Sequence, residues 1–104
     1  MSHNIGNIMK QAKKLQERMA ALQAELEQKT VAATSGGGMV TVTVSGKGEV
    51  VSLRIERDVV NAEDVEMLQD LILAAVNEGI RKAQEMTQSE MMKLTGGFKI
   101  PGLS

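Results

Sequence analysis

Apolar residues recur at alternating spacings of three and four along the first part of the chain. They are Ile5, Ile8, Ala12, Leu15, Met19, Leu22 and Leu26. This heptad spacing keeps one narrow apolar seam on a helix, and such a seam packs against another helix. We therefore predict a helix over about Asn7–Glu27, which forms an N-terminal helical arm within residues 1–28.

After Lys29 the pattern changes to a period of two. Val40, Val42 and Val44 alternate with threonines, and the run from Val51 to Ile55 alternates in the same way. A period of two buries one face of a β-strand. Glycine-rich turns separate the runs 31–35, 39–45 and 50–56, so they predict a three-stranded antiparallel meander over residues 29–57.

A second long helix is predicted over residues 61–94. Asn61 is a favourable N-cap residue, and acidic residues in the following turn complement the helix dipole. The apolar arc of this helix is broader than the cover of one sheet requires, and Gly79 would let a partner helix approach closely. We therefore assign a dimer interface to residues of this arc and of the valine face: Val40, Val42, Val44, Leu68, Ile72, Val76 and Gly79.

The predicted order is α-β-β-β-α, an α+β fold in a single domain of residues 1–104. A flexible, glycine-rich tail at 95–104 ends it. The chain has 104 residues and one aromatic side chain, Phe98. So small a chain buries little apolar surface, and oligomerisation is a common remedy. We therefore expect an obligate homodimer.

The amino-acid composition argues against several classes of function. The chain has no cysteine, so it forms no disulfide and has no thiolate metal ligand, as is typical of the reducing cytoplasm. His3 is the only histidine, and the glycine runs do not match a phosphate-binding loop. No apolar run approaches the roughly 20 residues of a membrane span. We expect a cytoplasmic protein that is not an enzyme and uses no metal, cofactor or small-molecule substrate.

Charge is distributed unevenly along the chain, although the total is only −1. Residues 1–18 carry a formal charge of +3, whereas residues 58–90 carry −6. Lys10, Lys14 and Arg18 are four residues apart and form a column along the first helix, with Lys13 beside it. Such a column either solvates a helix surface or neutralises phosphates, and a dimer would carry it twice.

Three stretches resemble the YbaB/EbfC family of bacterial nucleoid-associated proteins: "IMKQAKKLQERM", "VTVTVSGKGEVVSLRI" and "KLTGGFKIPGL". The helix "DLILAAVNEGIRKAQE" agrees as well. The resemblance implies a tweezer-like homodimer whose first helices project as arms. It also implies binding to double-stranded DNA with low or broad sequence preference, altered DNA conformation, and an influence on nucleoid organisation and gene expression. The basic part of the family's first helix falls here on Lys10, Lys13, Lys14 and Arg18.

Two functions therefore compete. The first is a homodimeric DNA-binding protein of the cytoplasmic nucleoid, with Lys93 and Lys99 as candidate additional contacts. The alternative is a protein-interaction or chaperone-like module that uses the exposed heptad seam of the first helix. Salt separates the two, because counterion release makes duplex binding fall steeply with salt whereas an apolar contact changes little.

Overall fold

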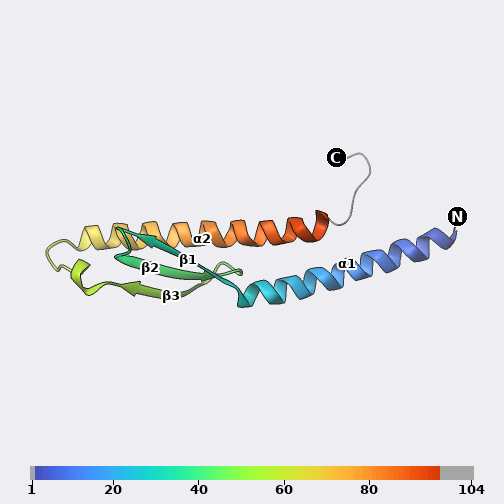
Figure 1. Ribbon diagram of the computed structural model, residues 1–104, viewed down its shortest axis with the longest axis horizontal. Helices are drawn as coiled ribbons and strands as arrows, with labels where there is room; N and C mark the ends of the chain where they lie inside the picture. The colour runs from blue at the N-terminus through green and yellow to red at the C-terminus, as the bar shows by residue number, and fades with distance from the viewer. Residues whose placement is uncertain (1, 97–104) are drawn as a thin grey trace.

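The computed structural model describes residues 2–96, and it has the predicted order of elements. A long helix leads into three strands, a short 3-10 turn and a second long helix (Figure 1). Their bounds are α1 Ser2–Gln28, β1 Thr30–Ser35, β2 Val40–Ser45, β3 Val50–Ile55, η1 Arg57–Val59 and α2 Val65–Gly96. The α-β-β-β-α order expected from the sequence is confirmed.

The strands form an antiparallel meander in the order β1-β2-β3. Val42 of β2 pairs with Ala33 of β1 and with Leu53 of β3. Residues that pair across strands point to the same face of a sheet. A bulge between Thr43 and Val44 shifts the register at one end of β2 and β3. The valines of β2 therefore share one face with residues from both neighbouring strands.

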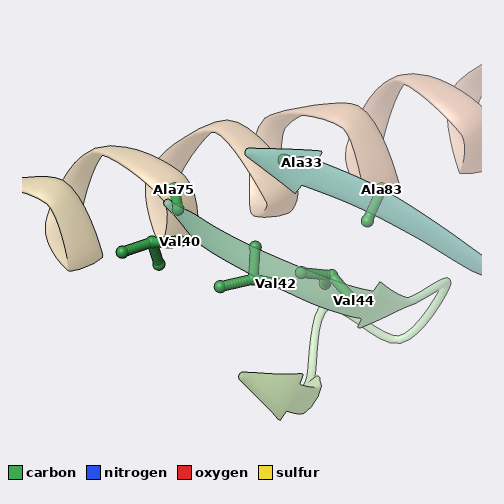
Figure 2. Close-up of a cluster of buried hydrophobic side chains, with 6 residues drawn as sticks. All are labelled: Ala33, Val40, Val42, Val44, Ala75 and Ala83. Atoms are coloured by element: carbon green, nitrogen blue, oxygen red, sulfur yellow. The ribbon is translucent and has the colours of Figure 1, made fainter. Parts of the chain in front are cut away.

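The core lies between that face and α2, which covers β1 and β2 (Figure 2). Val40, Val42 and Val44 have no exposed surface. Small residues recur every four positions on the helix side, at Ala75, Gly79 and Ala83. They let the helix backbone come close to the sheet, which is how a core without aromatic side chains is closed.

This packing corrects part of the predicted dimer interface. Val40, Val42, Val44 and Gly79 lie inside the core of a single chain, and the three valines have no surface left for a second copy. A Cβ at position 79 would lie 2.7 Å from Cγ2 of Val44 and 2.8 Å from Cγ2 of Val42. Gly79 therefore serves the approach of α2 to its own sheet.

The start of α2 also differs from the prediction. The helix begins at Val65, and the N–H of Met67 donates a hydrogen bond of 3.2 Å to Oδ1 of Asp64. Asn61 instead forms a turn, because its Oδ1 accepts from the N–H of Glu63 and its carbonyl accepts from Asp64. Such local bonds compete with helix formation, so the cap is Asp64.

The first helix is longer than predicted and projects from the body of the molecule (Figure 1). It continues through Gly6, whose cost of about 1 kcal/mol in a helix interior does not end it. The radius of gyration is 20.4 Å, with extents of 74 × 26 × 16 Å. A compact chain of this length would have a radius of gyration of about 13 Å. The chain is therefore a small body with a long arm.

The base of the arm is fixed to the body through Leu26. Leu26 is 3% exposed, and its carbonyl accepts hydrogen bonds from the N–H groups of Lys29 and Gly46. A Cβ at position 46 would lie 2.3 Å from that carbonyl oxygen. The turn between β2 and β3 therefore needs glycine at this point, and the direction in which α1 leaves the body is set there.

Candidate nucleic-acid interface

The predicted basic residues lie on the projecting helix. Lys10, Lys13 and Lys14 are all exposed. Lys10 and Lys14 are one turn apart, about 6 Å along the axis, and lie about 160° around the helix from Ala12 of the apolar seam. The structure thus places the ammonium-bearing face and the apolar seam on opposite sides of one helix.

None of these three lysines forms a hydrogen bond or ion pair with any residue of the described part, 2–96. Their charge is therefore not neutralised by the chain itself. The start of α2, with Glu63 just before it and Glu66 in its first turn, lies at the other end of the long molecule (Figure 1). Separation of this kind lets a basic arm attract an anion although the whole chain is weakly acidic.

Arg18 belongs to a different environment. It lines a shallow cleft in which Leu22 and Glu25 of α1 face Glu90 and Leu94 of α2. Arg18 is engaged in an interaction of its own. The structure therefore brings Arg18 into line with the lysines along α1 but places it at the base of the arm, where α1 meets α2.

Of the two candidate additional DNA contacts, Lys93 and Lys99, the described residues include only Lys93. Nζ of Lys93 lies 3.4 Å from Oε1 of Glu90, on the same helix and beside the base of the arm. The Lys93 side chain is 71% exposed, so this ion pair is readily exchanged for another anion. Lys99 lies outside the described residues, as does the predicted tail beyond Gly96. Thr95 and Gly96, assigned to that tail, belong to α2.

The outer face of α2 carries a second charged group that sequence reasoning passed over. Arg81 bonds to Glu78 on one side and to Glu85 on the other, with 3.0 Å between its Nε and Oε2 of Glu78. The hydrogen bond from Arg81 lowers the pKa of Glu78, and the same bond raises the pKa of Arg81. The spacing of three and four residues could have revealed it. Arg81 is thus neutralised locally, unlike the lysines of the arm.

An apolar surface remains uncovered beside the core. α2 lies over β1 and β2, and β3 is left almost bare (Figure 1). Val50 is 42% exposed, Val51 55% and Leu53 46%, although Leu53 pairs with the buried Val42 and shares its face. The expectation that β3 buries one face is therefore wrong within a single chain. The period of two correctly identified the apolar residues but could not show how far one helix extends across the sheet.

The three other members of the predicted interface lie on α2. Leu68, Ile72 and Val76 of α2 are half-buried and pack against the core. They keep accessible area, unlike the β2 valines. Leu73, one position along the helix, is 60% exposed.

The described residues contain neither a metal-binding cluster nor a helix that could span a membrane. Residues 2–96 contain no cluster of three or more His, Asp or Glu side chains that could hold a metal ion. Neither α1 nor α2 combines the length and the hydropathy that crossing a membrane requires.

Comparison with known proteins gives one consistent result. Residues 1–98 match the YbaB/EbfC DNA-binding family. A nucleoid-associated protein of Syntrophobacter fumaroxidans is 59% identical over 97 residues, which cover 93% of this chain and 88% of that one. A nucleoid-associated protein of Alkaliphilus metalliredigens is 59% identical over 100 residues, covering 96% and 88%. The crystal structure of an uncharacterized protein of Helicobacter pylori superposes with a TM-score of 0.75 at 26% identity, covering 86% of this chain and 94% of that one.

Proposed function

The chain belongs to the YbaB/EbfC DNA-binding family, and we propose that it binds double-stranded DNA as a homodimer with low or broad sequence preference. The observation that supports this most is the projecting α1 with three exposed lysines that have no partner in residues 2–96. Ammonium groups on a rigid helix neutralise phosphates, and phosphate contacts position a protein without reading the bases. The family is one of DNA-binding proteins and not of enzymes.

Low sequence preference follows from the kind of side chains on the arm. Base-specific contacts in the major groove come mostly from arginine or lysine on guanine and from asparagine or glutamine on adenine, and each needs a fixed bidentate geometry. The basic face of the arm presents Lys10, Lys13 and Lys14, which are point charges on flexible stems. The affinity of one arm is therefore set by phosphate contacts, and we expect dissociation constants of about 10⁻⁴ to 10⁻⁶ M at physiological salt.

The homodimer is supported by the uncovered apolar surface of the body. Val50, Val51 and Leu53 of β3 and Leu73 of α2 are between 42% and 60% exposed in one chain. Val50, Val51 and Leu53, with the half-buried Leu68, Ile72 and Val76, are therefore the candidate interface, because apolar surface of this kind marks association sites. A second copy seated there would leave both arms free.

Two arms on one body explain how such a protein would act in the nucleoid. Each arm binds phosphates separately, so a dimer either grips one duplex twice or joins two segments. Both modes change the path of the DNA, and binding at many sites would influence nucleoid organisation and gene expression. The same proposal places the protein in the bacterial cytoplasm, on the nucleoid.

Charge reversal on the arm tests the proposal. The variant Lys10→Glu with Lys13→Glu and Lys14→Glu should lose binding to a mixed-sequence duplex in a mobility-shift titration. These side chains are exposed and lie off the apolar seam, so the fold and the oligomeric state should be unchanged. A matched control reverses Lys47, Arg54 and Arg57 of the body, which gives the same change in net charge.

The control should retain most of the binding, because its residues lie on the body, away from the outer part of the arm that carries Lys10, Lys13 and Lys14. Two of them already pair with neighbouring glutamates, Lys47 with Glu49 and Arg54 with Glu56. Equal loss in both variants would mean that net charge matters and the position of the charge does not. Wild-type affinity in the arm variant would place the DNA site elsewhere.

The second candidate function is a protein-interaction module on the same arm. Ile5 and Ile8 of the seam are 60% and 63% exposed and Met9 beside it is 67% exposed, so the outer half of the arm offers apolar contact area. Methionine adapts to irregular apolar partners. Absence of duplex binding by the wild-type protein at low salt would favour this function.

A further inference from the structure

The apolar seam of α1 is covered along only half of its length. Leu26 is 3% exposed, and Leu22 and Met19 are half-buried where α2 runs beside α1. Leu15, at the edge of this stretch, is also half-buried. Ile8 and Ile5, further out, are 63% and 60% exposed. The cover therefore ends where α2 ends, and the outer seam (Ile5, Ile8, Ala12 and Leu15) continues beyond it.

We infer that the segment after α2, residues 97–103, docks along the outer seam of its own α1. The two helices are antiparallel (Figure 1), and Leu94 lies in one shallow cleft with Ala21 and Leu22 of α1. A chain that leaves α2 at Gly96 in the same direction runs toward the N-terminus of α1. Residues 97–103 therefore begin close to the inner end of the outer seam.

The lengths match. Leu15 and Ile5 are ten residues apart on α1, which is about 15 Å along the axis. The seven residues from Gly97 to Leu103 span up to about 23 Å when extended. The segment can therefore cover the whole outer seam and still accommodate the turn expected at Pro101-Gly102.

The sizes of the side chains also match. The outer seam has its only small residue at Ala12, between Leu15 and Ile8. Phe98 is the only aromatic residue of the chain and one of the first to follow α2. A ring seated over Ala12 would place Ile100 near Ile8, since two extended residues and one turn of helix each span about 6 Å. Leu103 would then reach Ile5. A large residue facing a small one is how packed surfaces interdigitate.

Docking on this side leaves the basic face free. Lys10 and Lys14 lie on the opposite side of α1 from Ala12, about 160° around the helix. The segment would therefore shield the apolar seam from other chains and support the arm as a helix. This inference does not depend on DNA binding.

Engineered disulfides test the contact directly, because the chain has no cysteine of its own. A disulfide needs Cα atoms within about 7 Å of each other. In the full-length protein, Ala12→Cys with Gly97→Cys should form a disulfide within one chain under mild oxidation. The matched control is Lys14→Cys with Gly97→Cys, since position 14 is as near along the axis but on the opposite face. It should form little.

The disulfides are read on a denaturing gel without reductant, on which a link between two chains doubles the mass. An intrachain disulfide in the Ala12 pair alone supports the inference. No intrachain link, equal links in both pairs, or a link only between chains would overturn it. The last result would assign the segment to the arm of a second copy.

Hydrogen exchange tests the docking of residues 97–103 on α1 without introducing cysteine. Phe98→Ala should reduce the protection of amides in residues 5–15, because the anchoring ring is lost from the segment. Lys99→Ala, its neighbour, should leave protection unchanged. Equal protection in the wild type and in Phe98→Ala would contradict the docking.

Discussion

Gly79→Ala tests how α2 is seated on the sheet. The substitution adds one methyl group, which would lie 2.7 Å from Cγ2 of Val44 and 2.8 Å from Cγ2 of Val42. Both valines have no exposed surface, and their branched side chains have a strongly preferred rotamer. Neither methyl group can therefore rotate into open space. The helix must lift from the sheet or the strand must shift.

The expected change in the free energy of unfolding of Gly79→Ala is the sum of two opposing effects. Alanine is favoured over glycine in a helix interior by about 1 kcal/mol. Adding a methyl group to a well-packed core costs about 1–3 kcal/mol. The expected net result is a loss of about 1 kcal/mol in the free energy of unfolding. In a chain of this length that corresponds to a fall of about 4–5 °C in the melting temperature.

The assay is urea unfolding followed by circular dichroism at one fixed protein concentration, since association shifts apparent stability. Asn77→Ala is the matched control, because Asn77 is exposed on the same helix and its side chain forms no hydrogen bond or ion pair within residues 2–96. It should gain about 0.5 kcal/mol from helix propensity alone. The double variant Gly79→Ala with Val44→Ala should be more stable than the sum of the single changes predicts, because the truncated valine makes room.

A Gly79→Ala protein that is more stable than the wild type would refute this account of the core. It would mean that the alanine Cβ meets open space and that α2 lies further from the sheet. Strict additivity in the double variant would likewise show that the added methyl group does not contact Val44, since residues in contact are expected to couple.

Other predictions concern the dimer, the tail and the surface charges. Sedimentation equilibrium at micromolar concentration should give a dimer, and a folded monomer would refute the two-arm mechanism. Ile72→Asp should dissociate or unfold the protein, because it places an unpaired charge against the core, whereas Asn77→Asp on the exposed side should be tolerated. Truncation after Gly96 should leave the dimer intact by the same measurement, and its loss would mean that residues 97–104 belong to the interface. Arg81→Met should raise the pKa of Glu78 toward its ordinary value in an NMR titration, because the hydrogen bond that lowers it is removed. Since the folded pKa of Glu78 is depressed, any stabilisation by this pair exists above the ordinary pKa of glutamate and is lost as the pH falls.

The order of elements could be predicted because each has a distinct period. The seam of α1 repeats every three and four residues, and the β2 valines repeat every two. Helix ends were less predictable, since Asn61 and Asp64 are both good caps and only the local hydrogen bonds decide between them. The residue type indicates how good a cap a residue can be. Whether Asn61 forms a cap or a turn depends on the local backbone geometry, which the residue type does not give.

The assignment of apolar residues to a partner was the weaker part of the prediction. Val40, Val42 and Val44 are equally apolar whether a helix of the same chain or a second copy covers them. The deciding fact is that one α2 covers two strands and leaves β3 bare. Periodicity gives the face of each strand but not the width of sheet that one helix can cover. The basic face of the arm was easier to place, because Lys10, Lys13 and Lys14 need only a helix to be positioned.

The most direct test of the central claim is the salt dependence of binding to a mixed-sequence duplex. Each phosphate neutralised contributes about −0.9 to the slope of log K against log salt. Lys10, Lys13, Lys14 and Arg18 on two arms would contact eight phosphates at most and give about −7. Partial engagement gives a working range of about −3 to −6. We expect the wild-type protein to fall in that range and the arm variant to lose most of the slope. A slope near zero, or one that the arm substitutions leave unchanged, would contradict DNA binding through the arms of α1.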